Sequence, residues 1–242
     1  MPVQGSETGG PTAGANATAA GSRHQPTVNC LRYGQSAWLV SFTASSRLRR
    51  NELAQQLAAR LRRRPEIDEA VAGIFSVTVC FDPSRHDAEG VRSLIERLAR
   101  IPSERRPGRT WCVPVRFGGS CGVDLEAAAA ALQLTPRQLV ERFCGVTYHV
   151  LCQGFTPGFA YLGWMPAQLS LPRRSEPRPR VPSGSVAIAA GLCAIYPFDS
   201  PGGWHIVGHT DFQPIRLSAS HLGLLRSGDR LVFTPHPDSP SS

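Results

Sequence analysis

Residues Val181–Trp204 read VPSGSVAIAAGLCAIYPFDSPGGW, and their pattern sets the fold expected of the C-terminal half. The apolar runs Val186–Ala189 and Cys193–Tyr196 alternate with turns that contain Pro and Gly. Between Tyr148 and a last apolar run at Leu231–Phe233, the apolar residues keep no helical periodicity over more than a short stretch. Short apolar runs between turn residues are typical of strands, so this half predicts a β-barrel or a strongly bent sheet.

Three segments of this half interleave Gly and Pro with aromatic and polar side chains. They are Gln153–Phe159, Val181–Ser185 and Ser200–His205. Such a mixture is typical of loops that present a surface. The alternative is that Phe155, Phe159 and Trp204 simply fill the core of the barrel.

The N-terminal half shows a different order of patterns. Strands are expected at 28–33 and 37–42, a helix from 46 to 65, a short segment at 69–72, a strand at 74–81, a helix around 91–98 and a strand at 110–117. Leucines 48, 53, 57 and 61 mark one face of the first helix. This order predicts an α+β sandwich of the ferredoxin-like kind, with two helices on one face of the sheet.

The stretch 100–109, with two prolines and a glycine, is the natural domain boundary. We expect a disordered leader at 1–26, a ferredoxin-like domain at 27–106, a β-barrel domain at 107–236 and a flexible tail at 237–242. Inside the barrel domain, a short helix should follow Asp124 and a second should start at Pro136, with a capping box between Thr135 and Gln138.

Basic charge is supplied by arginine alone. The chain of 242 residues has 26 basic residues, a formal charge of +8 and no lysine. Arginines 47, 49, 50, 60 and 62–64 fall on the first helix and its end, where they form a solvated face or meet nucleic acid or an acidic partner. No aromatic side chains are interleaved there to stack on bases, so we expect no nucleic-acid partner.

The absence of lysine excludes several chemistries from this chain. A Schiff base, a Walker-type phosphate lysine and a biotinylated lysine all require that residue. If ATP or a carrier biotin takes part in the reaction, another polypeptide must supply the lysine, or arginine must replace it.

Seven cysteines are scattered without a Cys-x-x-Cys pair or a nearby ladder of ligands. This indicates reduced thiols in a cytoplasmic protein and no metal site. The first 26 residues lack the apolar segment of a signal peptide, and no stretch is apolar enough to span a membrane.

Several separated motifs carry a resemblance to a known family. They are Gly154-Phe155-x-Pro157-Gly158-Phe159-x-Tyr161-Leu162-Gly163, Pro172-Arg173-x3-Pro177-Arg178, Val181-Pro182-x-Gly184-Ser185-Val186, Ile195-Tyr196-Pro197, Ser200-Pro201-Gly202-Gly203-Trp204, Gly208-x-Thr210 and Gly228-Asp229. In this order they resemble the family of 5-oxoprolinase B subunits, which includes the kinase inhibitor KipI and allophanate hydrolase subunit 1. The N-terminal half agrees in element order and in Val113-Pro114-Val115 with Gly122-Val123-Asp124-Leu125.

The resemblance implies a small α/β domain followed by a cyclophilin-like β-barrel. It also implies two partners, a homologous C subunit and a LamB/YcsF-like A subunit, which together resemble an ATP-dependent lactamase that opens 5-oxoproline to glutamate. Three positions depart from the family pattern: Leu192 stands where a Gln is usual, His209 where an Arg is usual, and Phe143 or Cys144 where a His is common.

The candidate ligand-binding residues come from these motifs. They are Phe155, Pro157, Phe159, Arg173, Arg178, Ser185, Tyr196, Gly202, Gly203, Trp204, His205 and His209. Prolines stiffen the arginine run, so Arg173 or Arg178 could clamp a carboxylate or phosphate, unless the run is a rigid loop that covers the barrel. Two glycines at 202–203 allow close backbone approach, while the two histidines on one strand lie too far apart to chelate a metal readily.

No self-sufficient catalytic set can be named from this sequence, because carboxylates are few and no Ser-His-Asp order stands out. The leading hypothesis is therefore a non-autonomous component of a 5-oxoprolinase-type hydrolase, with ATP used by the complex. A KipI-like inhibitor of a histidine kinase is the second hypothesis. The third is a carboxyltransferase-type segment of a urea amidolyase-like system, with biotin on a partner.

Overall fold

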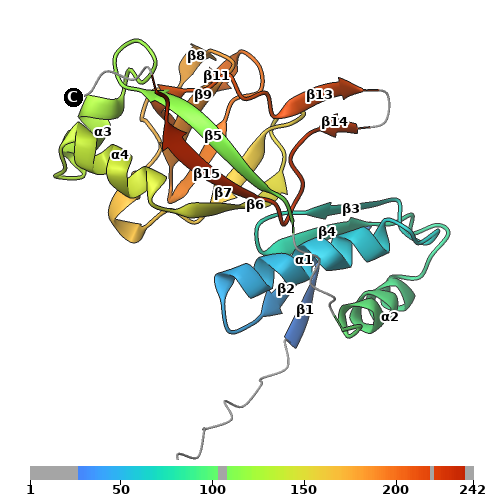
Figure 1. Ribbon diagram of the computed structural model, residues 1–242. Helices are drawn as coiled ribbons and strands as arrows, with labels where there is room; N and C mark the ends of the chain where they lie inside the picture. The colour runs from blue at the N-terminus through green and yellow to red at the C-terminus, as the bar shows by residue number, and fades with distance from the viewer. Residues whose placement is uncertain (1–26, 103–107, 219–220, 238–242) are drawn as a thin grey trace, which may run out of the picture.

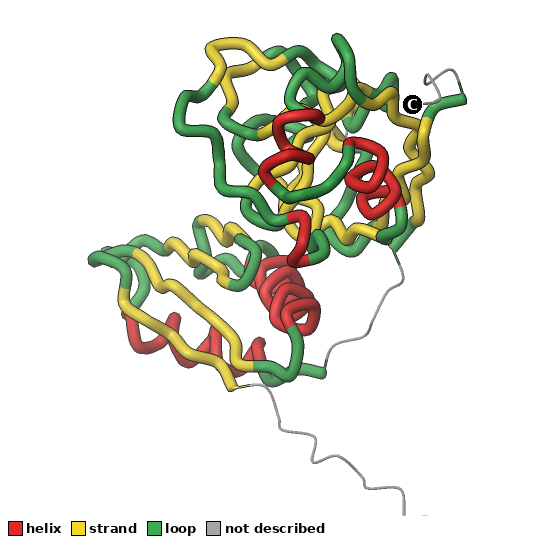
Figure 2. Tube along the Cα trace, turned by 90° about the vertical axis from the view of Figure 1, so that its left-hand side faces the viewer, coloured by secondary structure: helices red, strands yellow, loops and turns green. Residues whose placement is uncertain are grey.

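The chain forms two bodies that lie side by side, a four-stranded sheet with two helices and a closed β-barrel (Figures 1 and 2). The structure is a computed structural model and describes residues 27–102, 108–218 and 221–237. The leader expected at 1–26 and the tail expected at 237–242, except for residue 237, lie outside the described residues.

The N-terminal domain is a two-layer sandwich. Its elements are β1 (Thr27–Arg32), β2 (Ala37–Thr43), α1 (Arg47–Leu61), β3 (Glu69–Ala72), β4 (Ser76–Cys80) and α2 (Ala88–Ala99). All neighbouring strands are antiparallel, in the order β1-β2-β4-β3. Alternation on β4 buries Val77 and Val79 against Leu57 of α1 and Ile95 of α2, so both helices cover one face.

Local sequence signals place both helices. The Ser46 side chain accepts a hydrogen bond from the Arg49 amide and begins α1. The Asp87 carboxylate accepts one from the Gly90 amide and begins α2. Each N-cap satisfies an amide that has no partner inside its helix.

The barrel domain contains most of the remaining chain. Its elements are β5 (Thr110–Phe117), α3 (Leu125–Ala131), α4 (Pro136–Cys144), β6 (Thr147–Gln153), β7 (Ala160–Gly163), the 3₁₀ turn η1 (Ala167–Leu169), β8 (Arg178–Val181), β9 (Ser185–Ala189), β10 (Leu192–Ile195), β11 (Ser200–Gly202), β12 (His205–His209), β13 (Ile215–Ser218), β14 (His221–Gly223) and β15 (Arg230–Pro235). Seven strands close the barrel in the order β10-β7-β6-β15-β5-β12-β9. The first and last of these strands along the chain, β5 and β15, pair in parallel.

Helix α4 closes over the barrel core. Its capping box is formed as predicted, with Thr135 and Gln138 each accepting from the other's amide. Phe143 of α4 is fully buried, with its ring centroid 5.0 Å from that of Phe233 and 5.2 Å from that of Tyr148. The family departure at Phe143 is therefore a core position in this chain.

The two domains are joined by specific contacts. A bulge in β6 between Val150 and Cys152 frees the Leu151 carbonyl, which accepts from Asn51 Nδ2 at 2.9 Å and Gln55 Nε2 at 2.6 Å. Nearby, the rings of Phe75 and Trp164 stack with centroids 5.6 Å apart. Helix α1 thus meets the barrel at a carbonyl that the strand ladder does not use.

The expected fold class, an α+β chain with a small sandwich ahead of a barrel, is confirmed. The first domain runs ββαββα, and the strand expected at 110–117 is β5 of the barrel, beyond the boundary stretch 100–109. No helix among the described residues combines the length and apolarity needed to cross a membrane.

Candidate functional site

Aromatic side chains from separate predicted segments meet on the outer face of the barrel. Alternation on β9 turns Val186 and Ile188 into the barrel core and Ala187 and Ala189 outward. The outward alanines are covered by a second apolar cluster, whose rings we call the outer aromatic cluster: Phe159, Tyr161, Tyr196 and Trp204. Phe159, Tyr196 and Trp204 are therefore buried and Tyr161 is half-buried, all outside the barrel interior.

Phe159 is the centre of the outer aromatic cluster. Its ring centroid lies 5.1 Å from that of Tyr161, 5.4 Å from that of Tyr196 and 5.9 Å from that of Trp204, all edge-to-face. Phe155 adds a ring at 5.3 Å but stays 59% exposed, with a left-handed φ of 70°. The cluster thus offers one exposed aromatic edge to solvent.

Two glycines beside the cluster have different roles. A Cβ on Gly202 would lie 2.3 Å from the Tyr196 hydroxyl oxygen, so only glycine lets the phenol lie against β11. A Cβ on Gly203 would meet nothing closer than Pro177, at 3.7 Å. Of the predicted Gly-Gly pair, only Gly202 is required by this packing.

Asp124 holds the arginine-rich loop in place. Its buried carboxylate accepts from Arg178 at 2.8 and 2.7 Å, from Arg174 at 3.0 Å and from the Ile206 amide at 2.7 Å. Burial alone raises the pKa of this carboxyl, but these hydrogen bonds and the two positive charges outweigh it and lower the pKa. The sequence marked Asp124 as a helix start and as part of a family-like motif but not as a partner of the arginines, which lie 50 and 54 residues away.

Arg173 differs from its neighbours in the loop. It is exposed, and within the described parts of the chain its side chain has no hydrogen-bond or ion-pair partner. Its positive charge acts on the phenols of Tyr161 and Tyr196, where burial raises the pKa of both and Arg173 offsets part of that rise. Arg178 is occupied by Asp124, so Arg173 is the better placed of the two predicted anion ligands.

The remaining polar candidates lie along β12 and β9. His205 Nε2 is 2.9 Å from the Pro172 carbonyl oxygen, and His209 Nε2 is 3.0 Å from that of Ser183. A carbonyl only accepts, so each ring carries its proton on Nε2. Ser185 is buried and pairs with His209 across the sheet.

Pro157 lies exposed in the turn beside Phe155. Leu192, a departure from the family pattern, packs partly buried against the outer aromatic cluster. Among the described residues, no group of three His, Cys, Asp or Glu side chains is arranged to hold a metal ion.

The cysteines are free thiols in the structure. Burial raises the pKa of Cys144 and of Cys152 to about 11 and raises that of Cys193 as well. These thiols stay protonated at neutral pH and behave as small apolar side chains.

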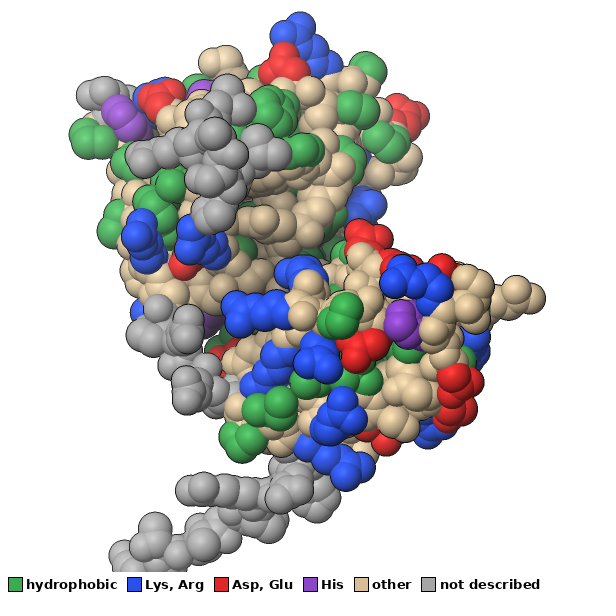
Figure 3. Space-filling view, turned by 90° about the vertical axis from the view of Figure 1, so that its right-hand side faces the viewer, with side chains coloured by type: hydrophobic (Ala, Val, Ile, Leu, Met, Phe, Trp, Pro, Cys, Tyr) green, Lys and Arg blue, Asp and Glu red, His purple; other side chains and the backbone are tan. Residues whose placement is uncertain are grey.

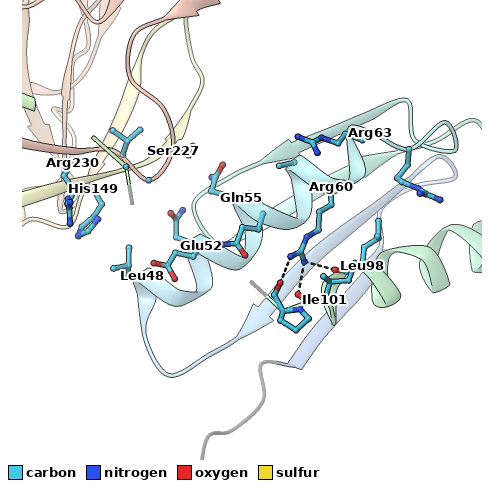
Figure 4. Close-up of a pocket in the computed structure, with 18 residues that line it drawn as sticks. Leu48, Glu52, Gln55, Arg60, Arg63, Leu98, Ile101, His149, Ser227 and Arg230 are labelled. Carbon is cyan, nitrogen blue, oxygen red and sulfur yellow. Dashed lines mark hydrogen bonds between the residues drawn. The ribbon is translucent and has the colours of Figure 1, made fainter. Parts of the chain in front are cut away.

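Sequence reasoning missed a groove between the two domains, which we call the interdomain groove. It has a volume of about 920 Å³ and lies between α1, the middle of β6 and the start of β15 (Figure 4). Figure 3 shows arginine side chains gathered along its edges. A second hollow of about 640 Å³ continues it past Gln55 and Ser227. The signal in the sequence was the run of arginines at the end of the first helix.

Comparison with known proteins places the chain in a family. Residues 28–225 match the family described as carboxyltransferase domain, subdomain C and D. The 5-oxoprolinase B subunit of Escherichia coli O157:H7 is 36% identical over 213 residues, which cover 86% of this chain and 96% of that protein.

Two solved structures are similar to this chain. The crystal structure of TTHA0988 aligns with a TM-score of 0.69 and 32% identity over 83% of this chain, which spans only 39% of that longer chain. The K. lactis urea amidolyase shares the fold alone, with a TM-score of 0.68 and 17% identity over 87% of this chain and 15% of that one. The chain therefore belongs to the carboxyltransferase subdomain C and D family, in the branch of the 5-oxoprolinase B subunits.

Proposed function

We propose that this chain is one component of an ATP-dependent, cyclic-amide-cleaving complex of the 5-oxoprolinase type, and that its outer aromatic cluster binds the substrate. The observation that carries the proposal is Arg173, an exposed guanidinium without a partner among the described residues, beside the phenols of Tyr161 and Tyr196. The name of the E. coli relative supplies the substrate class.

The chemistry of these groups fits a small cyclic amide that carries a carboxylate. Arg173 would pair with the carboxylate in bidentate fashion. The phenols stay protonated near neutral pH, because burial raises their pKa, and can donate to an amide oxygen. Rings of the outer aromatic cluster would cover the apolar part of the substrate and exclude water.

The four rings of the outer aromatic cluster and Arg173 include no activated nucleophile, and the chain has no lysine to bind phosphate. ATP use and ring opening are therefore assigned to the partners, a homologous C subunit and a LamB/YcsF-like A subunit, in the cytoplasm. The names of the relatives, each a B subunit of 5-oxoprolinase, support an assembly of several chains.

Reconstitution tests this proposal. The purified chain with candidate C and A subunits should release glutamate from 5-oxoproline and consume ATP. Arg173→Gln should raise the KM for 5-oxoproline about tenfold with little change in kcat, since the arginine binds ground state and transition state alike. Arg180→Gln, which lies close by in sequence on β8 and is paired with Asp199, is the control and should leave KM unchanged. Failure of every combination of these proteins to turn over 5-oxoproline would refute the proposal.

A second function has one supporting observation, the exposed aromatic side chains Phe155 and Phe198 on the barrel. Exposed aromatics favour docking on another protein, as a KipI-like inhibitor of a histidine kinase would require. Autophosphorylation of co-occurring kinases should then fall when the chain is added, and Phe155→Ser should relieve the inhibition.

A further inference from the structure

The interdomain groove carries a positive charge that the proposed function does not use. Four of its lining side chains are arginines, Arg60, Arg63, Arg64 and Arg230, against a single carboxylate, Glu52. Four positive charges less one negative charge leave +3 for these five side chains. A groove of this sign attracts an anionic ligand.

The four arginines are not equally available. Arg60 donates to the carbonyl oxygens of Leu98, Ile101 and Pro102 at 2.9 to 3.0 Å and so holds the end of α2. Arg64 pairs with Glu66.

Arg63 and Arg230, by contrast, have no side-chain hydrogen bond or ion pair within 27–102, 108–218 and 221–237. These two guanidinium groups are available to bind a ligand, and either can bind a carboxylate in bidentate fashion.

The two free guanidinium groups lie at opposite ends of the groove. Figure 4 shows Arg230 beside Leu48, near the start of α1, and Arg63 just past its other end. Fifteen residues at 1.5 Å each separate Leu48 from Arg63, a distance of about 22 Å. A single small carboxylate or phosphate cannot reach both groups, whereas an extended chain at about 3.3 Å per residue does so in about seven residues.

The floor between the two ends suits a peptide backbone. It presents the carboxamide of Gln56, the side-chain oxygen of Gln55 and the hydroxyl of Ser227. Gln55 Nε2 already donates to the carbonyls of Gly73 and Leu151. Amides and hydroxyls both donate and accept hydrogen bonds, as a backbone in a groove requires.

We propose that the interdomain groove binds an extended, acidic polypeptide segment of a partner protein, with one carboxylate on Arg230 and another about seven residues away on Arg63. This site is separate from the outer aromatic cluster. It stands whether or not the chain acts on 5-oxoproline.

Fluorescence anisotropy of a labelled peptide, titrated with the whole chain at low ionic strength, tests the spacing between the two acidic positions. The probe is a fluorescein-labelled peptide with acids at both ends, Glu-Glu-Ser-Gly-Ser-Glu-Glu. Its isomer Gly-Ser-Glu-Glu-Glu-Glu-Ser has the same composition and charge but cannot place acids at both ends. The first peptide should bind at least about fivefold more tightly than its isomer, and this difference in affinity should shrink with added salt.

Variants test the residues. Arg63→Gln with Arg230→Gln should weaken binding of the first peptide about tenfold and abolish its advantage over the isomer. The matched control is Arg97→Gln with Arg142→Gln, which removes the same charge from exposed helix positions outside the groove and should change the affinity less than about twofold. Thermal unfolding should show both double variants to be folded.

Three results would overturn the proposal: equal affinity for the two isomers, an equal loss in the control variant, or displacement of the peptide by ATP or inorganic phosphate at lower concentrations than unlabelled peptide. The last result would assign the groove to a small anion instead.

Discussion

Arg178 donates two hydrogen bonds to Asp124, from Nη1 to Oδ2 at 2.8 Å and from Nη2 to Oδ1 at 2.7 Å. Asp124 precedes α3 and Arg178 begins β8, and the Ile206 amide of β12 donates to the same carboxylate. One buried carboxylate therefore ties three distant segments together. It also fixes the loop that leaves Arg173 exposed.

Replacing this carboxylate should destabilise the barrel domain. Asp124→Asn keeps the shape of the side chain but removes its charge, so Arg174 and Arg178 lose their counter-ion. We expect the free energy of unfolding to fall by about 2 to 3 kcal/mol, less than for a fully buried pair because both arginines are partly exposed. Urea unfolding measures it. Asp211→Asn, which breaks the exposed pair with Arg116, should have no measurable effect and serves as the control.

The same pair predicts a dependence of stability on pH. The pKa of Asp124 is lower in the folded chain than its ordinary value of 3.8. Its contribution is therefore complete above about pH 4 and is lost as the pH falls through the lower folded-state pKa. The difference in unfolding free energy between the wild type and Asp124→Asn should shrink below about pH 4. A difference that stays constant down to about pH 2.5 would contradict this assignment.

The Gly-Gly pair offers a matched comparison. Gly202→Ala should force Tyr196 out of place, because the new Cβ would lie 2.3 Å from its hydroxyl oxygen, at a cost of about 1 to 3 kcal/mol. Gly203→Ala should be tolerated, since its Cβ would meet nothing closer than 3.7 Å. Thermal denaturation reports on both variants, and so does the intrinsic tryptophan fluorescence, to which Trp204 contributes as one of four tryptophans. Equal destabilisation by the two would argue against the packing described here.

The contact between the domains can be tested through Asn51 and Gln55. Removing both side chains leaves the Leu151 carbonyl of the β6 bulge without either donor. We expect Asn51→Ala with Gln55→Ala to cost about 1 to 3 kcal/mol and to speed amide hydrogen exchange where α1 meets β6. Gln56→Ala, next in sequence and without a hydrogen bond at its side-chain oxygen, is the control. Unchanged exchange in the double variant would show that other contacts hold the domains.

Much of the fold could be predicted because its signals are local. The capping box at Thr135 and Gln138, the leucine face of α1 and the short apolar runs of β9 and β10 each depend on residues close in sequence. The parallel partner of β5 could not be read in this way. Its partner β15 begins about 120 residues later, and nothing in the intervening sequence pattern indicates that the two strands pair.

The sequence named several residues of the candidate site but not the contacts between them. The motifs supplied Phe159, Tyr196 and Trp204, which the structure brings together. The sequence suggested Arg173 and Arg178 as equals, and only the position of Asp124, far away in the chain, distinguishes them. The interdomain groove was missed because it is formed by two domains, and no single periodicity describes a surface shared between them.

The parallel pairing of β5 with β15 has a consequence for synthesis on the ribosome. Thr110 opposes Arg230, so the seam of the barrel closes only after the residues between these two positions have been synthesised. The first domain can fold early, whereas β5 and β6 each keep one unpaired edge until β15 has been synthesised. A chain that stalls shortly before residue 230 would therefore expose two open strand edges, and degradation or chaperone capture of such truncated products would protect the cell from their aggregation.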